Sequence, residues 1–292
     1  MKHLFIIVYL FLSFTVAIFA ATPKISAEKH YNIIKLIELS GEKKSEETML
    51  QHMEEIMRNA PGTAKEKEIT NKFLDALNLN DLTELMVPVY DKYFDDKELA
   101  AAISFYSSPA GQKMAELRPM MVTNAIGMLE NVWVQMYNAK NSHANKPQEQ
   151  NSNTQAKMSP KQKAIYELLE VTGQTRRTDE IYRKICYSAR NMKTDVPVTK
   201  DSLMNVFVNL YDNYLDEQTI KDLTKFYKSA DGISLLSKEE KIQAEIGKVG
   251  AKYGARLRQN VIQNIKSDNK PETKENKQPQ QKQEDNKQIL ST

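Results

Sequence analysis

The chain has 292 residues, a formal net charge of +3 and 27% charged side chains. The charge is too small and too evenly spread to indicate nucleic-acid binding, and a single cysteine excludes an intramolecular disulfide. Apolar residues make up 40% of the chain, only nine positions are glycine, and the apolar positions recur at helical rather than alternating spacing. The sequence therefore predicts an all-α protein.

Residues 1–20 have the layout of a secretory signal peptide. A charge at Lys2 precedes an apolar run from Leu4 to Phe19, and the small residue Ala20 follows it. The run is shorter than the ~20 apolar residues that a membrane-spanning helix needs. We expect cleavage after Ala20 and an exported protein, in the periplasm or secreted.

Composition divides the remaining chain into two helical modules, over 28–138 and 159–265. Between them, residues 139–158 are rich in Asn, Gln, Ser and Lys, and residues 266–292 have a similar composition. Such segments bury too little apolar surface to offset their ordering entropy. We therefore expect a flexible linker and a disordered tail.

The two modules match each other. Residue 90 corresponds to residue 211, a shift of 121, and upstream Gly41 corresponds to Gly173, a shift of 132. The difference of eleven residues predicts that the second module lacks about three helical turns near Ile69 to Leu79. At the shift of 121, Tyr90, Asp91, Tyr93, Asp95, Phe105, Tyr106, Ser108 and Gly111 correspond to Tyr211, Asp212, Tyr214, Asp216, Phe226, Tyr227, Ser229 and Gly232.

Start and stop signals divide the first module into helices. A helix over 28–40 is expected to end at Gly41, a residue suited to a left-handed cap. Ser45 is expected to open the next helix. A capping residue followed by a glutamate three positions later predicts two further helix starts, at Thr63 and at Asp95.

Each module is predicted to close with a long amphipathic helix. Ser108 followed by Pro109 places a capping hydroxyl before a proline at the first helical position. In both modules the following apolar residues recur at spacings of three and four. They are Leu117, Met121, Ala125, Met128, Val132 and Met136 in the first module, and Ile242, Ile246, Val249, Tyr253, Leu257 and Val261 in the second.

The run FYSSPAGQKM over 105–114, together with residues 93–99, resembles the bacterial domain of unknown function 2059 family. The hallmark is an aromatic pair, a serine-proline helix start and a glycine one turn later. The second module is a degenerate copy, because Ala230 replaces the proline. The resemblance implies an exported helical domain, and it supplies no reaction, ligand or catalytic residue.

We interpret the repeated motif as structural. A helix N-terminus can bind an anion, but serine and proline also simply start a helix, glycine allows another helix to approach, and the aromatic rings fill the corner. The motif residues are Tyr90, Tyr93, Asp95, Phe105, Tyr106, Ser108, Pro109, Gly111, Tyr211, Tyr214, Asp216, Phe226, Tyr227, Ser229 and Gly232.

No catalytic residue, cofactor or metal site is predicted. The repeated aspartates Asp91 and Asp95 could form a cation site, but the second of them is placed as a helix N-cap. A stripe of Met49, Met53 and Met57 beside His52 could bind copper. Packing in the core explains the stripe more simply.

Three functional hypotheses remain open. The first is a non-enzymatic periplasmic binding or chaperone-like module with an envelope protein partner. The second is a hydrolase of envelope polymers that uses carboxylates such as Glu54, Glu55, Asp91 or Asp95. The third is peripheral membrane contact through the basic final helix, which carries Lys248, Lys252, Arg256, Arg258 and Lys266. Oligomeric state and the packing of one module on the other are left open.

Overall fold

A computed structural model describes residues 25–141 and 158–268, and every regular element in these ranges is an α-helix. The all-α prediction is therefore confirmed. The expected signal peptide and most of the expected linker and tail lie outside the described residues. The linker and tail boundaries shift slightly, because residues 139–141 and 266–268 still belong to helices.

Within the described ranges, the first copy contributes six helices and the second copy five. The first copy comprises α2 (Ala27–Leu39), α3 (Glu42–Asn59), α4 (Ala64–Asp75), α5 (Leu79–Tyr93), α6 (Asp96–Ser107) and α7 (Pro109–Asn141). The second comprises α8 (Pro160–Val171), α9 (Gln174–Met192), α10 (Lys200–Tyr214), α11 (Glu217–Lys228) and α12 (Ala230–Asp268). Helix α4 has no counterpart in the second copy, which explains the eleven-residue difference between the two shifts. Each copy ends in a long helix, as predicted.

Most of the predicted helix boundaries are confirmed. Gly41 has a φ of +75° at the end of α2, and Thr63 and Asp95 both form capping boxes. The prediction that Ser45 opens a helix is wrong, because α3 begins directly after the left-handed turn at Gly41. Ser45 lies inside that helix, and its hydroxyl donates to the Gly41 carbonyl at 2.9 Å.

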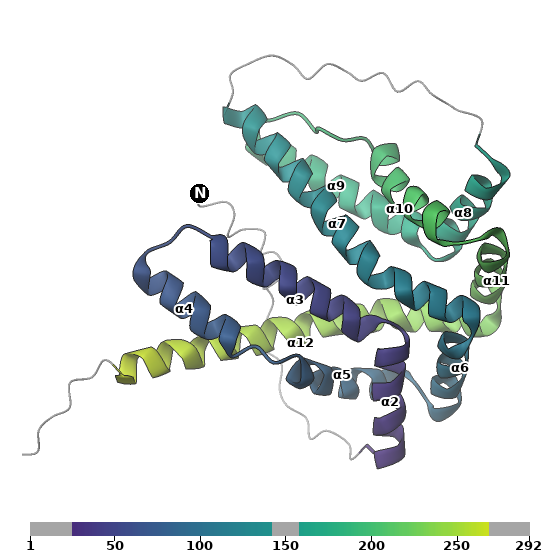
Figure 1. Cartoon of the computed structure of the whole chain (residues 1–292), viewed down its shortest axis with the longest axis horizontal. Helices are drawn as coiled ribbons and strands as arrows, with labels where there is room; N and C mark the ends of the chain where they lie inside the picture. The colour runs from purple at the N-terminus through teal and green to yellow at the C-terminus, as the bar shows by residue number, and fades with distance from the viewer. Residues whose placement is uncertain (1–24, 142–157, 269–292) are drawn as a thin grey trace, which may run out of the picture.

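The long helix of each copy packs against the other copy (Figure 1). Helix α12 runs along α4, α5 and α6 of the first copy, and α7 packs against α10 and α11 of the second. Each long helix also contacts the helix that precedes it in its own copy. The copies are therefore intertwined, in the manner of two protomers that exchange a terminal helix. They are not two separate domains.

One apolar core spans both copies, and equivalent residues meet within it. Phe105 of α6 stacks on Phe226 of α11, with ring centroids 3.6 Å apart and ring planes inclined by 5°. Because these residues correspond in the internal match, an approximate twofold axis passes between them. Core residues from both copies include Ile33, Ile37, Tyr90, Leu99, Tyr106, Leu117, Ile165, Leu169, Phe207, Tyr211, Leu223, Tyr227 and Ile242.

The glycine of the repeated motif allows each long helix to begin close to the preceding one. A Cβ atom at Gly111 would lie 2.0 Å from the Phe105 carbonyl oxygen, and one at Gly232 would lie 2.1 Å from the Phe226 carbonyl oxygen. Both distances are far below any allowed contact. The motif glycine therefore sets the position of the stacked phenylalanine rings.

Replacing Gly111 with alanine should destabilise the protein by about 2 kcal/mol or more, because the new methyl group meets backbone that cannot move freely. The control is Gly127→Ala in the same helix, where a Cβ would meet nothing within 4 Å. That change should stabilise the helix by roughly 0.5–1 kcal/mol. Urea denaturation measures the change in the free energy of unfolding for both variants. Equal changes for Gly111→Ala and Gly127→Ala would contradict the packing argument.

Candidate functional site

The repeated motif lies where the two copies meet, but its tyrosines differ in burial. Tyr106, Tyr211 and Tyr227 are fully buried, whereas Tyr214 is 52% exposed and Tyr93 is half-buried. The polar motif residues cap helices as expected. The hydroxyl groups of Ser108 and Ser229 each accept from the backbone N–H of the motif glycine at 3.2 Å, and the Asp216 carboxylate accepts from the Thr219 N–H at 2.7 Å.

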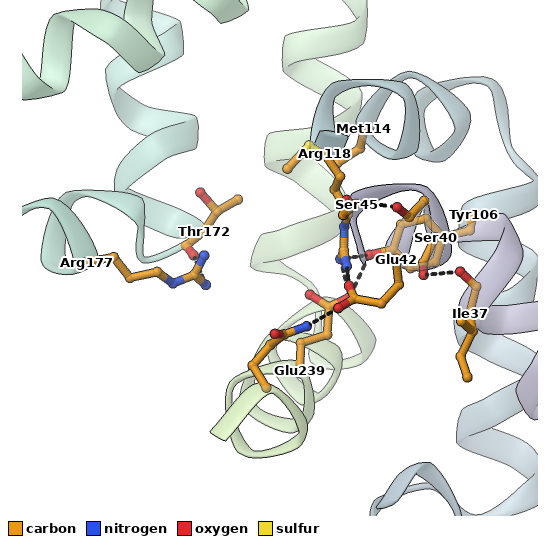
Figure 2. A network of polar contacts seen from close by, with 12 residues as sticks. Ile37, Ser40, Glu42, Ser45, Tyr106, Met114, Arg118, Thr172, Arg177 and Glu239 are labelled. Atoms are coloured by element: carbon orange, nitrogen blue, oxygen red, sulfur yellow. Dashed lines mark hydrogen bonds and ion pairs between the residues drawn. The ribbon is translucent and has the colours of Figure 1, made fainter. Parts of the chain in front are cut away.

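A partly buried polar network lies beside these rings (Figure 2). The guanidinium of Arg118 on α7 donates to Glu42 of α3 at 2.8 Å and to Glu239 of α12 at 2.5 Å. It also donates to the Tyr106 hydroxyl at 2.6 Å, and that hydroxyl donates to Glu239 at 2.6 Å. Gln243 of α12 donates to Glu42. The network therefore ties together four helices, α3, α6 and α7 of the first copy and α12 of the second.

The pair at the centre of this network follows from the duplication. Arg118 and Glu239 occupy equivalent positions at the shift of 121. Near a twofold axis, equivalent positions face each other, so identical charged residues would repel. Here the first copy supplies the cation and the second the anion. The sequence comparison did not single out this pair, although the unlike residues at matching positions could have revealed it.

Burial and charge shift the titration of several groups in the network. Burial raises the pKa of Tyr106 well above its usual value. Burial by itself would lower the pKa of Arg118. The neighbouring carboxylates of Glu239 and Glu42 outweigh this effect, so the pKa lies well above its usual value. Burial, reinforced by the Glu42 carboxylate, raises the pKa of Glu46 to about 7. Within the described chain every buried side-chain polar atom has a hydrogen-bond partner. The groups of the network therefore satisfy one another, and their role is to hold the helices together.

The repeated aspartates that suggested a cation site bind lysines instead. Asp91 pairs with Lys29 of α2 at 2.6 Å, and the equivalent Asp212 pairs with Lys161 of α8 at 3.0 Å. Each lysine also donates to the backbone carbonyl of the same aspartate. These pairs therefore fasten the first helix of each copy to the helix that carries the aspartate.

The carboxylates considered for hydrolysis are not assembled into one site. Glu54 pairs with Arg58 on its own helix at 2.8 Å, Asp91 pairs with a lysine as described, and Asp95 caps α6. Glu55 is exposed on α3. Among the described residues no group of three or more histidine, cysteine or acidic side chains is arranged to hold a metal ion.

The methionine stripe of α3 is not part of the core, contrary to the sequence interpretation. Among its 18 residues α3 buries only Glu42 and Ser45, while Met49 is 42% exposed and Met53 and Met57 are half-buried. After its first turns α3 diverges from α7 and pairs with α4 (Figure 1), which itself buries only one side chain. The stripe therefore forms a partly open thioether surface.

The basic residues of α12 are exposed, so contact with an anionic membrane surface stays a prediction. All five side chains point into solvent: Lys248, Lys252, Arg256, Arg258 and Lys266. Within the described part of the chain, no helix is both long enough and apolar enough to cross a membrane.

Comparison with known proteins identifies the two copies. The family model described as "Uncharacterized protein conserved in bacteria (DUF2059)" matches residues 80–135 and, a second time, residues 201–259. The matched segments cover α5 to most of α7 and α10 to most of α12, and they include the two long helices that exchange between copies. No curated protein and no solved structure matches the chain.

Replacing Arg118 with methionine should destabilise the protein by about 3 kcal/mol, because Glu42 and Glu239 are left without a cation. Lys113→Met is the control, since Lys113 lies on the same helix and pairs with Glu116 at the surface at 2.8 Å. Loss of such a surface pair should cost less than about 1 kcal/mol. Similar midpoints of urea denaturation for the two variants would show that the network does not hold the copies together.

The raised pKa of Glu46 predicts a pH-dependent stability. The folded chain binds a proton on the Glu46 carboxyl more tightly than the unfolded chain does. The stability that this proton contributes to the folded state is therefore complete below the ordinary pKa of 4.5 and is lost as pH rises to about 7. Glu46→Gln should therefore stabilise the protein at pH 8, by roughly 1–3 kcal/mol, and have a much smaller effect at pH 4.5. Urea denaturation at both pH values measures the change in the free energy of unfolding, and Glu47→Gln, at an exposed position, is the control. A stabilisation by Glu46→Gln that is the same at both pH values would contradict the prediction.

Proposed function

We propose that this protein, which carries two copies of the uncharacterized domain conserved in bacteria (DUF2059), is exported to the periplasm and binds other polypeptides without catalysing a reaction, in the manner of a chaperone. The export part of this proposal rests on the signal-like layout of residues 1–20. The binding part rests on the surface of α3.

The observation that carries the proposal is the open methionine stripe. Met49, Met53 and Met57 lie one helical turn apart on α3 and are only partly covered, although their spacing is that of a core-facing helix. Methionine side chains are flexible and polarisable, and proteins that bind many different partners use them for this reason. The stripe thus provides an adaptable apolar surface that fits the apolar side chains of a partner.

The elements around the stripe allow it to adjust. Helix α3 packs on α7 and more sparsely on α4, and α4 packs on α12 and buries only Leu74. Few buried apolar contacts give a segment low local stability, so the α3–α4 hairpin can shift at little cost. Because α4 exists only in the first copy, we assign the binding surface to that copy.

The test is crosslinking of the tagged full chain in intact cells, followed by mass spectrometry of the captured proteins. The variant Met49→Gln with Met53→Gln keeps the helix but removes two of the three thioethers of the stripe. The matched control, Glu47→Gln with Glu55→Gln, changes two exposed positions on the opposite face of α3.

We expect the methionine variant to lose most of the captured proteins and the glutamate variant to retain them. Truncating apolar contacts of this kind typically weakens binding by about tenfold or more. Purified proteins should repeat the pattern in an assay that follows suppression of aggregation of an unfolded substrate. Equal capture by both variants would refute a role for the stripe.

A further inference from the structure

The two copies differ at the corner between their first two helices. Gly41 and Gly173 are equivalent, and both have a φ near +75°. A Cβ atom at Gly41 would lie 2.3 Å from the carbonyl oxygen of Ala115 on α7, whereas one at Gly173 would meet nothing within 4 Å. The first corner is therefore closed against a long helix, and the second stands open.

Two residue differences explain why the second corner stays open. Buried Ser45 of the first copy corresponds to Arg177, an exposed cation, and a charge without a partner is expensive to bury. Ala115, which touches the first corner, corresponds to the larger Leu236. Helix α9 accordingly packs on α8, α10 and α7, and it does not lie along α12 as α3 lies along α7.

The open corner forms a depression of about 370 Å³ between the α8–α9 turn and the α11–α12 turn. This volume lies in the range of small-molecule sites, which is about 300–1,000 Å³. Val171, Ile233 and Leu236 give it an apolar wall, and Arg176, Arg177 and Lys228 give it positive charge. Ile233 is 59% exposed, so its side chain is accessible to a molecule in the depression.

Of the three cations, Arg177 is the one that forms no ion pair with a carboxylate in the described ranges, although Glu240 lies near enough to interact with its charge. Arg176 pairs with Glu240 at 2.8 Å, and Lys228 pairs with Glu167. Within the described ranges, the Arg177 guanidinium makes a single hydrogen bond, to the Thr172 carbonyl at 3.2 Å. Figure 2 shows the Arg177 side chain extending from α9 toward Glu239 without reaching the polar network. Most of its N–H groups are therefore available to a ligand.

We propose that this depression, which we term the α9 pocket, binds a small amphipathic anion. A carboxylate or phosphate head would accept hydrogen bonds from Arg177, a geometry that guanidinium groups favour. A short apolar body would cover Val171, Ile233 and Leu236. The site lies in the second copy and is independent of the methionine stripe, so failure of one proposal leaves the other standing.

The test is isothermal titration calorimetry of the full mature chain with decanoate as the probe. Decanol supplies the apolar body without the charge, and acetate supplies the charge without the body. We expect decanoate to bind, and both decanol and acetate to bind at least about tenfold more weakly. Decanol binding as tightly as decanoate, or no decanoate binding at millimolar concentration, would overturn the proposal.

Variants then locate the site. R177S installs the residue of the first copy and should weaken decanoate binding by about tenfold. R183S is the control, because Arg183 is exposed on the same helix outside the pocket lining. If R177S folds poorly, R177Q removes the charge and keeps the bulk. Equal decanoate affinity in the Arg177 and Arg183 variants would place the ligand elsewhere.

Discussion

The contact between the two copies at the approximate twofold axis determines the rest of the fold. Phe105 stacks on Phe226 there, and the Arg118–Glu239 pair closes the polar network alongside. Both long helices depend on this contact in part, because each buries some of its apolar side against the other copy. A covalent connection between the copies would not by itself hold them in one relative orientation, since a tethered pair of modules samples many orientations.

Duplication within one chain frees the two copies to become different. In a symmetric pair of identical chains, a residue on the axis faces itself, so an arginine there would repel its equivalent. In this chain the equivalent position holds Glu239, which replaces repulsion with a partly buried hydrogen-bonded ion pair. The same freedom accounts for α4, present only in the first copy, and for the α9 pocket, present only in the second.

The two proposed binding surfaces have a common physical origin in incomplete packing. Helix α3 has the apolar spacing of a core helix, but α4 and α7 cover its methionine stripe only in part. Helix α9 is kept from the equivalent contact by Arg177 and Leu236. In both copies, therefore, it is the second helix that leaves surface uncovered, while the first helix and the helices that match the family model form the shared core.

The sequence by itself determined the helical class, the duplication, most helix ends and the missing α4, because helix periodicity and capping depend on residues close together in the chain. It also identified the motif residues, Gly111 and Ser108 among them, whose roles are local. It could not determine that the long helices exchange, that Met49 lies outside the core, or that Arg118 meets Glu239. Those features depend on which helices pack together, and an amphipathic stripe specifies that a helix needs a partner without specifying which one. Only the tertiary structure decided the partner, and with it the surfaces left open for binding.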